Sequence, residues 1–169
     1  MQLWIENALS RLTWLEAAIS ISAYALVAGL LLADIIGREL FSTSIYGAQK
    51  MAVQLTMIAA FMGLTLATGQ GSHMRAEAAD ALVPKRWSAQ ADRFGYVLTA
   101  VLYAALAAIS FKFMMETRHY GMRIPVLGWQ MWPVQLVLPI AFSSSALKSL
   151  AFAVFPAIAP LREIRALEE

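Results

Sequence analysis

Charged residues are placed so that four long segments of the chain contain none of them. These segments are residues 17–33, 51–74, 94–111 and 124–147, with lengths of 17, 24, 18 and 24 residues. Roughly 20 mostly apolar residues in a helix cross a hydrocarbon core of about 30 Å. Each segment is long enough if the first and third run slightly into their flanks. We therefore predict four transmembrane helices, near residues 16–37, 49–70, 94–116 and 132–155.

The predicted spans are helices, because a backbone in lipid must satisfy its own hydrogen bonds and these runs lack the alternation of a barrel strand. Composition agrees: 60% of the residues are hydrophobic and 14% are charged, where a globular domain has about a quarter charged. A net charge of +2 is too small for a nucleic-acid binder. The predicted fold class is an all-α integral membrane protein, with the lipid bilayer as its surroundings.

Two flanks surround the predicted membrane domain of residues 16–155. Residues 1–15 carry Ile5, Leu9 and Leu12 at helical spacing, which suits either a short helix in the membrane interface or a continuation of the first span. Pro156 and Pro160 end the last span, and residues 156–169 form a polar tail.

The distribution of Lys and Arg predicts the orientation. Eight of the 13 lie in the N-terminal flank, in the loop after the second span and at the C-terminal side, and five lie in the other two loops. The positive-inside rule then places both termini in the cytoplasm. Lys148, which falls within the fourth span, is expected to snorkel toward the inner face.

Few residues in the spans could carry chemistry. Asp34 is expected to be the one embedded carboxylate of the first span, and Arg38 at i+4 can pair with it. His73 and His119 fall at opposite faces, so they cannot ligate one haem. The chain has no Cys, and no catalytic, metal or phosphate-binding motif is found. We expect no enzyme activity, no metal site and no cofactor in this chain.

Small residues recur at four-residue spacing along three spans, which lets membrane helices approach closely. Such stripes can close the bundle or dock another membrane protein, and both uses are expected here. The helix-packing candidates are Gly29, Ala33 and Gly37 in the first span, Ala59, Gly63 and Ala67 in the second, and Ala104 and Ala108 in the third.

The fourth span contains a proline in its interior. Pro139 cannot donate a backbone hydrogen bond and should kink the helix. The serines at 143–145 follow one turn later, where their hydroxyls can satisfy the kinked backbone or bond to a neighbouring helix.

Several short motifs resemble the small membrane subunit of tripartite ATP-independent periplasmic (TRAP) transporters. They are DIIGRELF at 34–41, FMG at 61–63, HMRAE at 73–77, LVP at 82–84, IPVLG at 124–128, MW at 131–132 and LPIAF at 138–142. The chain departs from the family at the start of the second span, where Ala48, Gln49 and Lys50 replace the frequent Glu, and at Gln130, where a Pro is frequent.

The resemblance implies a non-catalytic subunit in a bacterial inner membrane. Its implied partners are a large membrane subunit, which holds the organic acid and Na⁺ sites and moves as an elevator, and a periplasmic substrate-binding protein. This chain would brace the large subunit and help dock the binding protein.

The resemblance also suggests roles for individual residues. Asp34 and Arg38 would fix a loop near the binding protein, and His73 and Arg75 would anchor the inner interface. Trp129, Trp132 and Pro139 would shape the outer part of the fourth span. Topology and interfacial anchoring would explain the same residues without any contact to a partner.

One alternative function stays open at this point: a stand-alone, dimeric, proton-coupled multidrug carrier of four helices. Such a carrier needs an essential membrane carboxylate, for which Asp34 would serve.

Overall fold

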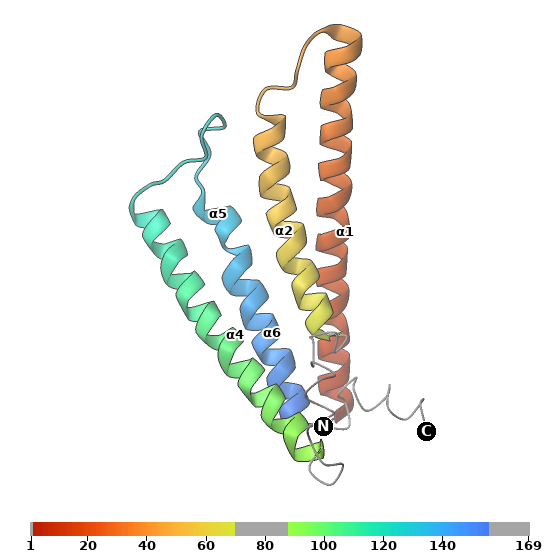
Figure 1. Ribbon diagram of the computed structural model, residues 1–169, viewed down its shortest axis with the longest axis vertical. Helices are drawn as coiled ribbons and strands as arrows, with labels where there is room; N and C mark the ends of the chain where they lie inside the picture. The colour runs from red at the N-terminus through yellow and green to blue at the C-terminus, as the bar shows by residue number, and fades with distance from the viewer. Residues whose placement is uncertain (1, 70–87, 156–169) are drawn as a thin grey trace.

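The computed structural model describes residues 2–69 and 88–155, and all the regular elements among them are helices (Figure 1). They are α1 (Gln2–Phe41), α2 (Ala48–Gly69), α4 (Ser88–His119), α5 (Trp132–Gln135) and α6 (Val137–Val154). Four stretches are long and apolar enough to cross a membrane: Leu9–Phe41, Ala48–Gly69, Arg93–His119 and Trp132–Val154. For the described residues, the predicted all-α fold is confirmed, as are four helical stretches that are long and apolar enough to span a membrane.

Residues 2–15 form the first turns of α1, and they continue into the first span without a break. The whole helix has 40 residues, which corresponds to a length of about 60 Å. Whether its first turns lie in the membrane interface stays a prediction, as does the cytoplasmic placement of the termini.

The helices pack as two pairs. α1 lies along α2, α4 lies along α6, and contacts between α2 and α6 join the pairs (Figure 1). We call the end where α1 begins and α6 ends the terminus end. The opposite end carries the loops 42–47 and 120–131 and is called the loop end. In the view of Figure 1 the two pairs diverge toward the loop end.

The join between the pairs is made by close-packed and aromatic side chains. Ala59 of α2 and Ala141 of α6 have no exposed surface. Phe142 of α6 meets Phe61 of α2 edge-on, with ring centroids 5.6 Å apart, and lies nearly parallel to Tyr103 of α4 at 6.1 Å. Phe142 therefore connects α6 with α2 and α4. Such van der Waals contacts hold membrane helices together, because lipid provides no hydrophobic driving force between them.

The last span is interrupted near its start. α5 ends at Gln135 and α6 begins at Val137, so Leu136 separates the two helices. Gln135 is the residue four before Pro139, and the proline has no N–H to donate to its carbonyl oxygen. The interruption thus falls where the sequence predicts a kink caused by Pro139.

Candidate functional site

The first candidate site lies at the loop end, where the side chain of Asp34 is covered by the loop that follows α1. Arg38, one helical turn later, forms an ion pair with the Asp34 carboxylate. The other carboxylate oxygen accepts a hydrogen bond from the backbone N–H of Ile45, with 2.8 Å between N and Oδ1. Asp34 retains only 2% of its surface exposed. The pair predicted from the i,i+4 spacing is present, and the carboxylate also fastens the loop.

Gly37 permits the close return of this loop onto α1. The N–H of Thr43 donates to the carbonyl oxygen of Gly37 at 3.1 Å. A Cβ atom at Gly37 would lie 2.8 Å from the carbonyl oxygen of Thr43, which is closer than nonbonded atoms approach. The small residue predicted to pack helices therefore packs against a loop.

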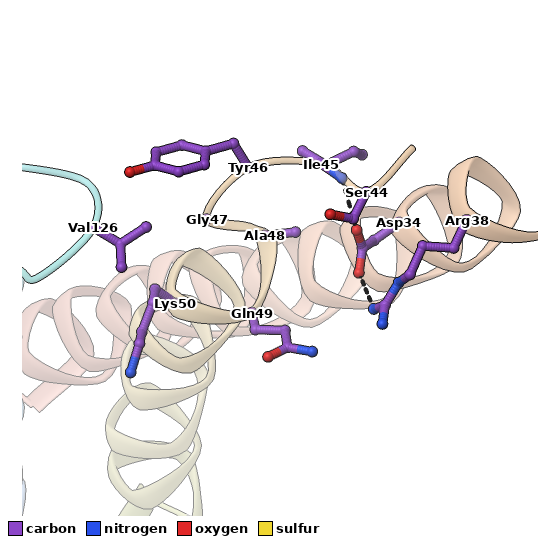
Figure 2. A pocket seen from close by; sticks show the side chains of 10 residues that line it. All are labelled: Asp34, Arg38, Ser44, Ile45, Tyr46, Gly47, Ala48, Gln49, Lys50 and Val126. Carbon is purple, nitrogen blue, oxygen red and sulfur yellow. Dashed lines mark hydrogen bonds and ion pairs between the residues drawn. The ribbon is translucent and has the colours of Figure 1, made fainter. Parts of the chain in front are cut away.

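A cavity of about 330 Å³ opens beside Asp34. Figure 2 shows the residues that line it, which come from the end of α1, the loop 42–47 and the start of α2, with Val126 from the 120–131 loop. Asp34 is already bonded on both oxygens, whereas the Arg38 side chain is half exposed and Lys50 is exposed. The exposed charges at this cavity are therefore mainly positive.

The two loops of the loop end touch each other at Gly47. Its φ of +77° lies in the left-handed region, and a Cβ there would come within 2.7 Å of the Leu127 Cδ2 atom. A side chain at this position would therefore be strained by its backbone and would also collide with the neighbouring loop. This contact connects the α1–α2 pair to the α4–α6 pair at the loop end.

The 120–131 loop folds back on itself as a small hairpin. The N–H of Ile124 donates to the carbonyl oxygen of Trp129 at 2.7 Å, and the N–H of Met131 donates to that of Met122 at 3.0 Å. Trp129, which follows the turn at 125–128, is 60% exposed. The hairpin therefore presents an aromatic side chain at the loop end.

Trp132 anchors this hairpin to the adjoining helices. Its indole Nε1 donates to Gln130 Oε1 at 2.6 Å, and the Arg118 guanidinium lies 5.2 Å from its ring centroid. A cation over the indole face is attracted by the ring quadrupole. Gln130, at which the chain departs from the family pattern, thus has a specific partner.

The second candidate site lies toward the terminus end, and the sequence analysis did not predict it. Glu16 of α1 forms an ion pair with Lys148 of α6 and accepts a hydrogen bond from Ser144. The Lys148 ammonium also donates to the backbone oxygen of Thr65 in α2, with 3.0 Å between N and O. We call Glu16, Lys148, Ser144 and Thr65 the polar clasp. It joins three helices.

The polar clasp shows that two predictions made from the sequence, one for Lys148 and one for Asp34, were wrong. Lys148 does not snorkel: 1% of its surface is exposed, and its charge is bonded inside the bundle. Asp34 is not the one embedded carboxylate of the first span, because Glu16 lies within Leu9–Phe41 and is 4% exposed. The predicted first span began at Glu16, so its depth was hidden; in the structure Glu16 lies seven residues after Leu9 and Lys148 six residues before Val154.

Hydroxyl groups continue the polar contacts beside the clasp. Ser20 donates to the backbone oxygen of Ala59 at 3.2 Å, and Thr68 Oγ1 lies 3.3 Å from Ser145 Oγ. Of the two uses expected for the serines after Pro139, bonding to a neighbouring helix is the one seen for Ser144 and Ser145.

The predicted small-residue stripes have different surroundings. In α2, Ala59 is fully buried, Gly63 and Ala67 are half-buried, and a Cβ at Gly63 would lie 3.9 Å from Ser20 Oγ. The remaining candidates in α1 and α4 lie on the surface of the chain: Gly29, Ala33, Ala104 and Ala108.

Other predicted residues cannot be placed in either site. His73 and Arg75 lie outside the described residues. Within 2–69 and 88–155, no group of three or more His, Cys, Asp or Glu could hold a metal ion.

The sequence of the chain is similar to that of a known family of transport proteins. The sequence model described as tripartite ATP-independent periplasmic transporters, DctQ component, matches residues 27–156. The chain belongs to the DctQ family. It is thus a small membrane component of a TRAP transporter, with membrane and binding-protein subunits as partners. The match includes Asp34, Arg38 and Lys148, whereas Glu16 lies before its first residue. No curated protein matches the chain.

Proposed function

We propose that this DctQ protein is a non-catalytic subunit that braces the large membrane subunit of a TRAP transporter and helps dock the periplasmic binding protein. The family match over residues 27–156 carries the proposal. Two features of the structure support it: four helices are long enough to span a membrane, and the Asp34 carboxylate holds the loop 42–47 in place.

The proposed orientation places the loop end in the periplasm of a bacterial inner membrane and both termini in the cytoplasm. The excess of Lys and Arg toward the terminus side supports this orientation. The docking surface would then comprise the loops 42–47 and 120–131, where Tyr46 and Trp129 are exposed. Asp34 would act by holding the first of these loops in place.

The proposed transport reaction is uptake of an organic acid coupled to Na⁺. In this scheme the substrate and sodium sites belong to the large subunit, and this chain needs no cofactor. The surroundings of Asp34 favour this scheme over a stand-alone carrier, because both carboxylate oxygens are already bonded to Arg38 and Ile45. A coupling carboxylate must instead be free to exchange its ion or proton.

Reconstitution in vesicles tests the proposal. The assay uses this chain, the large subunit encoded for the same transporter and its binding protein, with a sodium gradient and a panel of labelled carboxylates. We expect uptake only when all three proteins and inward-directed sodium are present. Uptake by this chain alone that Asp34→Asn abolishes and Glu39→Gln preserves would contradict the proposal and support the carrier.

A further inference from the structure

The buried face of α1 is mostly polar. Among the described side chains of α1, those classed as buried are Glu16, Ser20, Ala23 and Asp34, and three of these four are polar. Glu16 and Asp34 are 18 residues apart, which is five turns at 3.6 residues per turn. They therefore lie on the same face of the helix. The rotation of α1 about its axis decides whether the Glu16 carboxylate reaches Ser144 and Lys148 of α6.

Apolar packing alone gives α1 little rotational preference. Lipid is as apolar as the side chains of a membrane helix, so no hydrophobic drive selects one face over another. The side of α1 away from α2 carries Ala25, Gly29 and Ala33, all exposed, and a Cβ at Gly29 would meet nothing within 4 Å. A rotated α1 would bring that small-residue side toward α2, where it could also pack closely.

The polar clasp supplies a directional contact that apolar packing lacks. Glu16 and Lys148 are both almost completely buried, and each has a further partner in Ser144 and Thr65. Desolvating two charges usually cancels the attraction between them, and apolar replacements of a buried pair are often neutral or stabilising. The best-attested use of such buried polar contacts is to select one register among several.

We propose that the Glu16–Lys148 pair is a register lock that fixes the rotation of α1 against α2 and α6. It acts by specifying one rotation and not by adding net stability. The lock involves a residue outside the family match, so it adds a feature that family membership does not assign to this chain.

Disulfide crosslinking in the full-length chain tests the lock, because the chain has no Cys of its own. The reporter pair is Ser20→Cys with Gly63→Cys, at positions that face each other. The matched control pair is Ser22→Cys with Gly63→Cys, in which the first position is rotated by about 200° around α1. In the native background, oxidation in membranes should crosslink the reporter pair and not the control pair.

The deciding variant replaces the lock by apolar side chains of similar size, Glu16→Leu with Lys148→Met. We expect the amount of monodisperse protein in detergent to match the parent, while the reporter crosslink weakens and the control crosslink appears.

Two outcomes would overturn the proposal. If the apolar double variant crosslinks as selectively as the parent, the pair does not set the rotation. If the double variant cannot be recovered as folded protein while Lys112→Met, which removes an exposed lysine of α4, is recovered normally, the pair is needed for stability and is not a register lock. The crosslinking tests only the rotation of α1, whereas sodium-driven uptake tests the proposed function. A loss of uptake in one of these variants would therefore not change what the crosslinking shows about the rotation.

Discussion

Among the described side chains of α1, two carboxylates are buried, and the two are held in different ways. Asp34 at the loop end is bonded by Arg38 of the same helix and by the N–H of Ile45, eleven residues along the chain. Glu16 toward the terminus end is bonded by Ser144 and Lys148, which are 128 and 132 residues away. The first site can form as α1 and its loop fold. The second can form only when α6 has packed beside α1.

This difference in sequence separation explains why one site was predictable and the other was not. Spacing of i,i+4 places Arg38 over Asp34 in any helix, so the pair follows from the local sequence. Pairing Glu16 with Lys148 requires the relative position and rotation of the first and fourth helices. Periodicity does not provide that information, and the predicted first span, which began at residue 16, placed Glu16 at its edge.

The largest effect is expected from breaking the polar clasp on one side. Lys148→Met leaves the Glu16 carboxylate buried without its counter-ion, and removing one partner of a buried ion pair costs about 3–5 kcal/mol. We expect a marked fall in the thermal unfolding midpoint of the purified protein. Lys112→Met is the matched control, since Lys112 is exposed on α4. An equal midpoint for the two variants would mean that Glu16 is solvated in the native protein.

A smaller and more local effect is expected at the loop end. Asp34→Ala removes the acceptor for the Ile45 N–H and the partner of Arg38, so the loop 42–47 should open more often. Hydrogen exchange of that loop should become faster, while exchange in α6 stays unchanged. Glu39→Ala, at an exposed position of the same helix, should leave both rates as in the parent. Faster exchange spread across all helices would show that Asp34 supports the whole bundle.

The smallest effect is expected from a single methyl group. Gly37→Ala places a Cβ 2.8 Å from the Thr43 carbonyl oxygen, so the loop must shift. Gly29→Ala is the same substitution in the same helix, with nothing within 4 Å of the added atom. We expect a modest loss of thermal stability and faster exchange at 42–47 for Gly37→Ala only. Equal behaviour of both variants would contradict the close return of the loop onto α1.

The sequence predicted elements well and contacts between distant elements poorly. The four spans follow from the gaps between charges, and the interruption near Leu136 follows from Pro139, because both depend on local chemistry. Small residues were harder to interpret: Ala59 is buried between helices while Gly29 is exposed, although both lie in similar stripes. Spacing identifies a stripe, but the rotation of each helix decides what the stripe meets.

We propose that this DctQ chain works as a bracing subunit within a larger complex. The test is affinity purification from its native membrane, in mild detergent and without crosslinking. We predict recovery of a larger membrane protein of about a dozen helices in near-equal amount. Recovery of this chain only as a homo-oligomer, under conditions where the large subunit is present and intact in the same membranes, would contradict the claim.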